Sequence, residues 1–366
     1  MGYTRFLHRE ATSLAAAGYQ VTLIGLHDTN PLPQELPVKI VPVPVQRLGR
    51  KPGLVRTVVQ IASTEQAQVY HCVDPWALSV GLSFKRRNPS VKLVYEATEW
   101  FARAQMERPD LPLPLRWLAC RWVERLEHRA KLDADAIIDT NATRARRFNN
   151  ARCPVVLVPN YPRREDLPAP VEEREPCLAY TGLISRHRGF DVLLRALAAV
   201  MHTHPELKLR VAGGFDPRDS LEAWTQWFAE ENRLSPNLEL LGWLPYAEMF
   251  RAVSSCMAGV ILLQGTRTND YTGQPNKLFE FMGAGLPVIC SDFPEMGTIV
   301  RRHQCGWLVN PADVMAVATA ISELLADPAA ATARGLAARA AVLTNYTWDV
   351  AEKELLNLYQ QLLPIT

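Results

Sequence analysis

Short apolar segments alternate with longer amphipathic segments through almost the whole chain, and this alternation restricts the fold more than any other feature. The apolar segments have the length of single strands, whereas the segments between them have the apolar spacing of helices. Strands that alternate with helices form parallel sheets covered by helices on both faces. The predicted strands are Gln20–Gly25, Val38–Val43, Val69–Cys72, Val91–Tyr95, Ala136–Asp139, Val155–Val158, Cys177–Thr181, Leu207–Ala212, Leu238–Leu241, Gly259–Leu263, Leu286–Cys290 and Trp307–Val309.

A proline-rich segment interrupts this alternation near the middle of the chain. The sequence PNYPRREDLPAPVEEREP, residues 159–176, can form neither a central strand nor a helix. At 366 residues the chain is also too long for one ordinary core. We therefore predict an α/β protein with two Rossmann-like, doubly wound domains that face a cleft. The predicted boundaries are 1–160 for the first domain, 161–176 for the linker, 177–345 for the second domain and 346–366 for a last helix.

The composition excludes several classes of function. A net charge of +2 gives no reason to expect nucleic-acid binding. The seven cysteines form no C-x-x-C pair, which excludes the common zinc patterns and indicates reduced thiols. No apolar run reaches the roughly 20 residues that span a bilayer. We expect a cytoplasmic protein that is at most peripheral on the inner face of the plasma membrane.

Two loops of the second half follow predicted strands and suit a phosphorylated ligand. In YTGLISRHRGF, residues 180–190, Gly182 permits close approach of a backbone, and Arg188 precedes a helix. A guanidinium beside a helix N-terminus can bind a diphosphate. In GWLPYAEMF, residues 242–250, the turn that contains Trp243 could present main-chain groups to a flat base. Each segment alone is equally compatible with an ordinary strand-to-helix turn.

A third segment, QPNKLFEFMGAGLPVICSDFP at 274–294, carries a lysine and a glutamate at the start of a predicted helix. Asn276 is placed to cap this helix. Lys277 then lies at the mouth of the site, where phosphate oxygens would be. Glu280 lies about one turn into the helix, within reach of two ribose hydroxyls. The alternative interpretation of Lys277 and Glu280 is a solvated helix face.

Together these segments resemble a retaining glycosyltransferase of family 4 with the GT-B fold. The blocks in the second half are YTG, RGF, LLRAL, LELLGW, PNKLFEFMGAGLPVICSDFP, CGWLV, PAD and YTWDVAEKELLNLYQQLL. Those in the first half are TRFLHREATSLAAAGYQVTLIG, VYHCVDPWALSVGLSFKRR, KLVYEATEWF and VPNYP. The likeness covers almost the whole chain in the right order. It is closest to the bacterial branch that builds surface polysaccharides and lipid-linked glycans.

The resemblance implies that the second domain binds a nucleotide-diphosphate sugar and that the first binds a glycan or lipid-linked acceptor. It also implies that the last helix crosses back to the first domain. Glu280 matches the second glutamate of the family motif, which binds the ribose. Arg188 stands where the family has a basic residue that neutralises the diphosphate leaving group, and Lys277 is a second candidate for this catalytic role. The other residues expected to bind the donor are Gly182, Trp243 and Asn276. No metal or other cofactor is expected.

Three features depart from the family pattern. Thr272 occupies the position of the first glutamate of the motif, although Asp270 lies nearby. Thr98 stands where this branch usually has a histidine. Relatives have a strand ahead of TRFLHRE, so we expect a first domain without its first strand and with two exposed strand edges. The remaining candidates for the cleft are His8, His71, Glu99 and Thr272.

Two local patterns allow more than one interpretation. The D-x-D pattern at Asp133–Asp135 matches a metal motif of the other large glycosyltransferase fold, but a turn before a strand is the simpler interpretation. The amphipathic segment 112–131 is interpreted as a helix with a core-facing stripe and an arginine-rich solvated face. Its alternative is a surface that binds a membrane, together with the basic segment 45–56. The predicted stripe consists of Leu115, Leu118, Trp122 and Leu126.

Other classes of protein remain as alternatives to an active transferase. The substitutions Thr98 and Thr272 would also fit a GT-B protein that has lost catalysis and acts as a nucleotide-sugar-binding or scaffold partner. A nucleotide-sugar epimerase of this fold would need acid and base groups that these threonines do not supply. A nicotinamide oxidoreductase is disfavoured, because no G-x-G-x-x-G follows a predicted strand.

Overall fold

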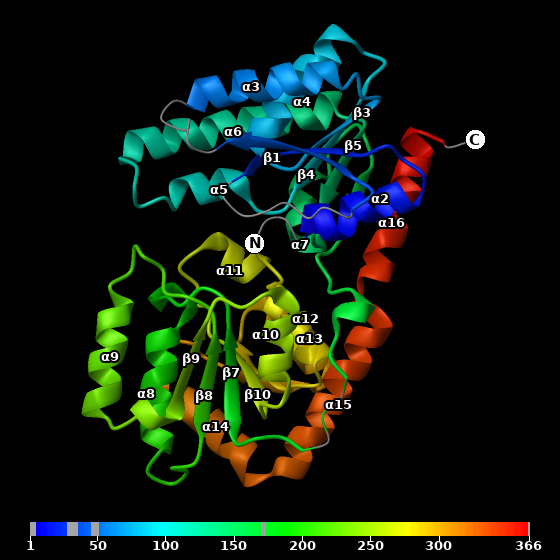
Figure 1. Cartoon of the computed structure of the whole chain (residues 1–366). Coiled ribbons are helices and arrows are strands. Elements are labelled where there is room, and N and C mark those ends of the chain that lie inside the picture. Colours follow the sequence, from blue (N-terminus) through cyan, green and yellow to red (C-terminus); the bar gives the residue numbers. More distant parts are fainter. Residues whose placement is uncertain (1–4, 28–35, 45–50, 170, 172, 365–366) are drawn as a thin grey trace. The chain divides into compact units, whose positions relative to one another are not determined.

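A computed structural model of the chain describes residues 5–27, 36–44, 51–169, 171 and 173–364. The chain divides into two compact units, shown in Figure 1. The first unit contains residues 1–160 and 348–366, and the second contains residues 161–347. Each unit has parallel strands and covering helices, so the predicted α/β class with two Rossmann-like domains is confirmed.

The first unit contains six described strands. In the described residues they form two parallel sheets, β1–β2 and β3–β4–β5–β6. Its elements are η1 (Phe6–Ala11), α2 (Thr12–Ala16), β1 (Thr22–His27), β2 (Lys39–Pro44), α3 (Lys51–Thr64), β3 (Val69–Cys72), α4 (Pro75–Arg87), β4 (Lys92–Ala97), α5 (Phe101–Met106), α6 (Leu113–Asp133), β5 (Ala136–Asp139), α7 (Ala142–Ala145), η3 (Arg146–Phe148), β6 (Val155–Leu157) and α16 (Trp348–Leu362).

Side chains that alternate along β4 build the core on both faces of the four-stranded sheet, as the pleat of a strand requires. Val94 packs with Trp348 and Leu355 of α16 on one face. Tyr95 packs with Phe148 on the other face, where α4 also lies. The last helix therefore belongs to the core of the first unit, although the segment before it belongs to the second.

The second unit contains one six-stranded parallel sheet in the order β12-β11-β10-β7-β8-β9. From β7 the chain adds β8 and then β9 on one side. It then crosses back to place β10 on the other side of β7, followed by β11 and β12. Its elements are η4 (Arg164–Asp166), β7 (Cys177–Thr181), η5 (Arg186–Arg188), α8 (Phe190–Val200), β8 (Lys208–Ala212), α9 (Leu221–Glu231), η6 (Ser235–Asn237), β9 (Leu238–Gly242), α10 (Tyr246–Ser254), β10 (Ala258–Ile261), α11 (Thr268–Thr272), α12 (Asn276–Gly283), β11 (Val288–Ser291), α13 (Pro294–His303), β12 (Gly306–Val309), α14 (Val314–Ala326) and α15 (Pro328–Asn345).

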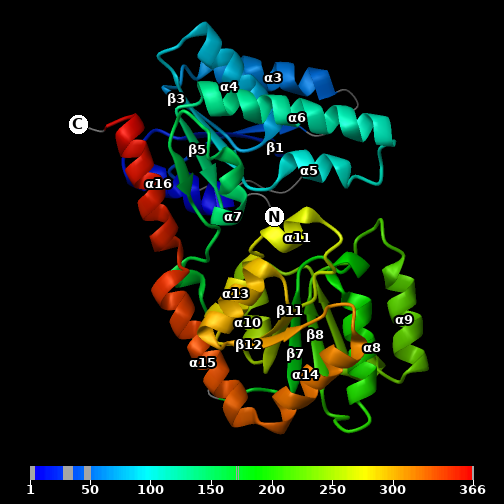
Figure 2. The ribbon, with the colours of Figure 1, turned by 180° about the vertical axis from the view of Figure 1, so that it is seen from behind.

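Two apolar clusters cover the two faces of this sheet. Leu178 and Tyr180 of β7 pack against α8, α9 and α14. Cys177 and Ala179 point the other way, into a cluster with α10, α12, α13 and α15. Figures 1 and 2 show these helices on opposite sides of the strands. The central strands β7, β10 and β11 are buried at every position and almost entirely apolar, which made them recognisable in the sequence.

We predicted that residues 161–176 form a linker between the domains. In the structure these residues pack onto the second unit. The Tyr161 ring lies 4.8 Å from that of Phe279, centroid to centroid. Arg174 donates to the carbonyl oxygens of Ser254, Cys256 and Gly285. The prolines exclude regular structure from this segment, but its aromatic and arginine side chains still have buried partners.

The predicted core-facing stripe of α6 is wrong at its N-terminal half. Leu115 and Leu118 are 50% and 55% exposed, and only Trp122 and Leu126 are partly buried. The buried positions of α6 are Cys120, Val123, Glu127 and Ala130. The periodicity identified an apolar face but could not show which part of it another element covers.

No single helix among the described residues is both long and apolar enough to cross a membrane. The segments Val314–Ala326 and Pro328–Leu362 meet the length and composition criteria together, but they are bent by 101°. Val317, Ile321 and Leu324, on the apolar face of the first of these segments, are buried in the core of the second unit.

Candidate functional site

The strand order of the second unit places a binding site at the carboxyl ends of β7 and β10. The direction of chain building reverses between these two strands, and ligands of open parallel sheets bind at such a reversal. The loop after β7 contains Gly182 and Arg188, and the segment after β10 leads into α12 with Lys277 and Glu280. The residues predicted from separate motifs therefore meet at one edge of one sheet.

Glycines bring the backbones after β7 and β8 close together. Gly182 has a φ of +89°, which side chains rarely tolerate. A Cβ atom at Gly213 would collide with the carbonyl oxygen of Gly182, and one at Gly214 would collide with the indole of Trp243. The Trp243 ring is nevertheless 54% exposed. The two backbones therefore pack directly against each other, with Gly182 and Gly213 both buried, and an accessible aromatic ring lies beside Gly214.

Two cationic side chains converge beside Gly182. The Lys277 ammonium donates to the carbonyl oxygen of Thr181 at 2.9 Å and lies 4.8 Å from the centroid of the Tyr180 ring. A Cβ built on Gly182 would lie 3.1 Å from Nη1 of Arg188. In the part of the chain that the structure describes, neither Arg188 nor Lys277 forms an ion pair.

The electrostatics of this pair favour an anionic ligand. The pKa of Lys277 is lowered to about 7. Desolvation by burial is the main cause, and the positive charge of the nearby Arg188 is the second. A partly buried ammonium beside a guanidinium costs free energy, and a dianion placed between the two groups would reduce that cost. The Lys277–Arg188 pair is therefore organised for a ligand with two or more negative charges.

Glu280 lies in the same helix with its carboxylate 9% exposed. Its Oε1 accepts a hydrogen bond of 3.0 Å from the Tyr246 hydroxyl of α10. Tyr246 lies within the predicted base-binding segment 242–250, but sequence reasoning gave its side chain no role. Asn276 is the first residue of α12 and not its cap, because Pro275 holds the cap position and no side chain caps the helix.

Neither Thr272 nor Asp270 points its side chain freely into the site. The Thr272 hydroxyl donates to the carbonyl oxygen of Thr268 one turn earlier. Asp270 accepts a hydrogen bond from the Arg267 amide at the start of α11, and its Oδ1 lies 3.4 Å from Nε2 of His187. The carboxylate of Asp270 is thus used to hold this loop.

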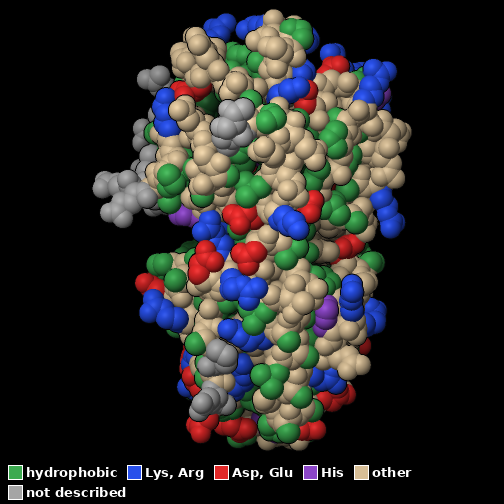
Figure 3. All heavy atoms as spheres, turned by 90° about the vertical axis from the view of Figure 1, so that its right-hand side faces the viewer, with side chains coloured by type: hydrophobic (Ala, Val, Ile, Leu, Met, Phe, Trp, Pro, Cys, Tyr) green, Lys and Arg blue, Asp and Glu red, His purple; other side chains and the backbone are tan. Residues whose placement is uncertain are grey.

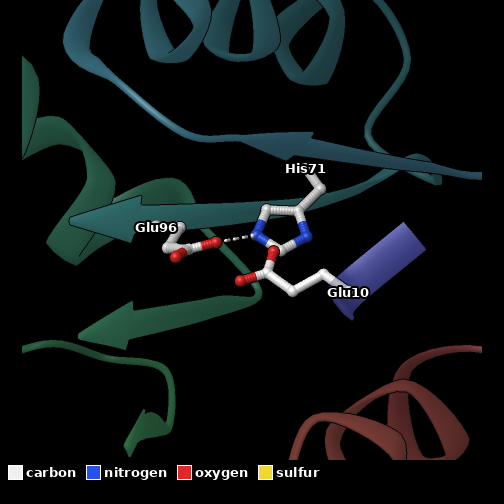
Figure 4. A group of neighbouring side chains, drawn as sticks. All are labelled: Glu10, His71 and Glu96. Carbon is white, nitrogen blue, oxygen red and sulfur yellow. Dashed lines mark ion pairs between the residues drawn. The ribbon is translucent and has the colours of Figure 1, made fainter. Parts of the chain in front are cut away.

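The first unit contains a second, buried group of polar residues at the carboxyl ends of β3 and β4. Figure 4 shows Glu10 of η1, His71 of β3 and Glu96 of β4 pointing toward one another. Nε2 of His71 lies 3.1 Å from Oε2 of Glu96, and Nδ1 lies 3.0 Å from the Tyr359 hydroxyl of α16. Of these residues only His71 was a sequence candidate. No short motif connects positions 10, 71, 96 and 359.

Arg5 makes this group an ion-pair network. Its guanidinium lies 2.8 Å from Oε1 of Glu10 and 2.6 Å from Oε1 of Glu96, and it donates to the carbonyl oxygen of Val158. Two carboxylates and an imidazole are also ligands that a divalent cation accepts. However, the arginine already places a positive charge between the carboxylates, so the donor set does not fit a further buried cation well.

The two carboxyl groups have opposite pKa shifts. Desolvation raises the pKa of Glu10 well above its usual range. Burial alone would raise the pKa of Glu96 too, but Arg5, followed by His71, lowers it to about 2. With a proton on Glu10, Arg5 and ionised Glu96 remain as a neutral ion pair. Four ionisable side chains are then buried at a lower cost in free energy than if all were charged.

The other candidates of the first unit lie apart from this network. His8 and Glu99 are both exposed. The D-x-D carboxylates have structural partners: Asp133 pairs with Arg129, and Asp135 pairs with Lys85 and accepts a hydrogen bond from the Leu93 amide.

On the face shown in Figure 3, acidic and basic side chains are intermingled, in keeping with the net charge of +2.

Two family models match the chain and together cover most of it. "Glycosyltransferase Family 4" matches residues 2–161, and "Glycosyl transferases group 1" matches residues 175–327. Among curated proteins, a glycogen synthase of Mycobacterium tuberculosis is 26% identical over 182 residues, 50% of this chain and 42% of the relative. A D-inositol 3-phosphate glycosyltransferase of Salinispora tropica is 31% identical over 54% of this chain and 40% of its own. The matched region thus spans less than half the length of these relatives.

Solved structures agree on the fold along the whole chain. Sucrose-phosphate synthase from Thermosynechococcus elongatus has a TM-score of 0.76 at 21% identity and covers 98% of this chain and 92% of its own. Anabaena HepE, solved in complex with UDP-glucose, has a TM-score of 0.69 at 16% identity. The match covers 88% of this chain and 86% of HepE. At these identities the likeness establishes the GT-B fold of two Rossmann-like domains.

The network of Arg5 predicts that two isosteric substitutions have unequal effects. Glu10→Gln keeps the shape of a protonated carboxyl group and should change the free energy of unfolding little. Glu96→Gln leaves Arg5 buried without a full counter-charge and should cost about 3–5 kcal/mol. Urea titrations at neutral pH measure both, and equal losses would contradict the assignment of the proton to Glu10.

The same network predicts how stability depends on pH. Because the folded pKa of Glu96 is lowered, its contribution is present above about 4.3, the pKa of a free glutamate, and is lost as the pH falls toward 2. The raised pKa of Glu10 acts in the opposite direction, so its contribution is lost as the pH rises through that pKa. Glu10→Gln should remove the loss at high pH and leave the loss at low pH.

Proposed function

Since the chain belongs to the family 4 glycosyltransferases, we propose that it transfers a sugar from a nucleotide-diphosphate sugar to a glycan or lipid-linked acceptor with retention of configuration. The observation that carries this proposal is the convergence of Arg188 and Lys277 beside Gly182, without an ion-pair partner among the described side chains. A nucleoside diphosphate is the leaving group of such a transfer, and it is the kind of dianion that this pair favours.

The donor would lie along the carboxyl edge of the second sheet. Its diphosphate contacts Arg188 and Lys277, which stabilise the charge that develops on the leaving phosphate. Gly182, with its positive φ, turns the chain from β7 toward Arg188, and Gly213 lets the loop after β8 pack against this turn. Glu280 accepts hydrogen bonds from the ribose, with Tyr246 orienting its carboxylate, and the exposed ring of Trp243 lies beside the base.

Catalysis on this proposal needs neither a metal nor a carboxylate at position 272. Retention without a protein nucleophile is possible where an oxygen of the departing phosphate takes the proton of the acceptor. The two fixed cations then supply the electrostatic stabilisation that a metal ion would otherwise provide. The acceptor would bind to the first unit, where His8, His71 and Glu99 remain candidates. Binding of the donor is therefore expected to be unchanged by a chelator.

The alternative is a GT-B protein that binds a nucleotide sugar or a partner without transferring the sugar. Thr272 and Thr98 motivate it, since both replace side chains usual in the family. The paired cations count against a scaffold that binds only a partner, because such a protein would gain nothing from keeping an ammonium whose pKa is lowered to about 7.

A thermal-shift panel with UDP, GDP, ADP and CMP tests the donor site. A ligand at 100 times its Kd adds about 2.7 kcal/mol to the stability of the folded state. One nucleoside diphosphate should raise the melting temperature of the wild type, with or without EDTA. Arg188→Ala and Glu280→Ala should each lose most of that shift.

Arg186→Ala is the matched control for Arg188→Ala. Arg186 lies in the same turn, but it is exposed and pairs with Asp191 and Asp219. The Arg186→Ala variant should show the same nucleotide-induced rise in melting temperature as the wild type. A cooperative melt without a shift from any nucleotide would favour the non-catalytic alternative, whereas a shift that survives Arg188→Ala would place the diphosphate elsewhere.

The pKa of Lys277 predicts how donor affinity depends on pH. Below pH 7 the lysine is protonated and attracts the diphosphate, and above pH 7 the unliganded protein must take up a proton on binding. The Kd of the nucleotide should therefore rise as the pH increases above 7, approaching tenfold per pH unit. Lys277→Gln should weaken binding at pH 6 and flatten this dependence. Calorimetric titrations in buffers of different ionisation enthalpy measure both the affinity and the proton uptake.

We also propose that the first unit contacts a membrane surface through the start of α6, on the cytoplasmic side, where free cysteines persist. Four neighbouring apolar side chains there are between 50% and 66% exposed: Leu113, Leu115, Trp117 and Leu118. Arg121 and Arg125 are exposed further along the same helix. Apolar side chains with flanking arginines match the surface of an anionic bilayer, which is where a lipid-linked acceptor would be found.

Co-sedimentation with anionic phospholipid vesicles tests this surface. Trp117→Ala combined with Leu118→Ala should reduce the bound fraction several-fold. Trp227→Ala removes an equally exposed tryptophan, 56% against 57%, from the second unit and should have no effect. Binding that is equal for all three proteins, or absent for the wild type, would contradict the proposal.

A further inference from the structure

Two buried thiols of the second unit lie in contact at the amino ends of its strands, away from the donor site. Sγ of Cys256 lies 3.3 Å from Sγ of Cys177. Cys177 is the first residue of β7, and Cys256 lies in the turn between α10 and β10. Both side chains are fully buried. Residues next to them, Glu175 and Pro176, are exposed, so the thiols lie directly beneath the surface.

The surrounding residues hold the two cysteines in register. The Met257 amide donates to the carbonyl oxygen of Cys177 at 2.7 Å, which fixes one strand against the other. Arg210 of β8 donates to the carbonyl oxygen of Ala252 and to the Ser255 hydroxyl in the same turn. The guanidinium of Arg210 also pairs with Glu175 and Glu239. The turn therefore has a defined position from which the sulfurs can approach.

The protonation states of the two thiols differ in the way that disulfide chemistry requires. The hydrogen bond from Cys256, supported by the charge of Arg210, lowers the pKa of Cys177. The same hydrogen bond, together with burial, raises the pKa of Cys256. Cys177 is the one cysteine of the seven, all within the described residues, whose pKa is lowered. The cysteine that ionises more readily thus lies beside a thiol that can resolve its oxidised form.

We propose that Cys177 and Cys256 are a redox modification site that forms a reversible intramolecular disulfide with a peroxide as oxidant. The Cys177 thiolate attacks one oxygen of hydrogen peroxide, which breaks the O–O bond and releases hydroxide, and Cys177 becomes a sulfenic acid. The sulfur of Cys256 then attacks the sulfur of Cys177, gives up its proton and releases water. Two thiols and one peroxide thus become one disulfide and two waters, and a dithiol reductant reverses the change.

The disulfide would act on the donor site through α10. A disulfide brings the sulfurs to about 2.05 Å, so the turn at the end of α10 must move toward β7. The other end of α10 carries Tyr246, which bonds to Glu280. Oxidation should therefore change nucleotide affinity; this consequence rests on the proposed function, whereas formation of the disulfide does not.

Peptide mass spectrometry after mild peroxide treatment tests the bond directly. Free thiols are alkylated under denaturing conditions, and the expected product is a peptide pair linked through Cys177 and Cys256 that a reductant separates. Cys177→Ala should abolish the link. Cys290→Ala, which also removes a fully buried thiol, should leave it unchanged. A folded protein without this link, or with Cys290 or Cys305 oxidised to the same extent, would overturn the proposal.

Nucleotide titration of the oxidised and reduced protein tests the coupling separately. A severalfold change in Kd that is reversed by reductant and absent in Cys177→Ala supports it. An unchanged Kd in a protein that carries the disulfide would overturn the coupling. Absence of nucleotide binding in the reduced protein would instead count against the proposed donor site, so the two failures can be told apart.

Discussion

The hydrogen bond from Lys277 to the carbonyl oxygen of Thr181 connects α12 to the end of β7, and the candidate donor site depends on it. The bond holds an ammonium beside Arg188, although desolvation first and the repulsion of Arg188 second lower the pKa of that ammonium. A protein can keep such a pair only where the surrounding fold supplies the missing stability. Here that support comes from the apolar side chains of α12, which are buried against the sheet.

The two units solve the problem of buried charge in different ways. In the first unit Arg5 neutralises two glutamates within the protein, so the network is complete without a ligand. In the second unit Arg188 and Lys277 form no direct ion pair within the described residues, and Glu280 offsets only part of their charge. The remaining charge is left for a ligand to balance. The first arrangement is typical of a structural network and the second of a binding site.

The sequence predicted the strands well, because they depend on local patterns, and local motifs also pointed to residues that the fold brings to the carboxyl ends of β7 and β10. Strands buried on both faces are continuous apolar runs, and β3, β5 and β7 were predicted to the residue. The predictions failed where an outcome depends on packing between distant segments. The partnership of Tyr246 with Glu280 requires the position of α10, and the network of Glu10 and Glu96 requires three elements to meet. The exposure of Leu115 and Leu118 shows the same limit, since periodicity cannot show what covers a helix face.

The strand order of the second unit has a consequence for how the site comes into being. Arg188 and Gly182 come from the half of the sheet built outward from β7, whereas Lys277 and Glu280 follow β10, where the other half begins. Neither half alone contains both members of the Arg188–Lys277 pair. If the proposed donor site is correct, a nucleotide would bind only after the two halves have joined, and its binding would report completed folding rather than the presence of either half.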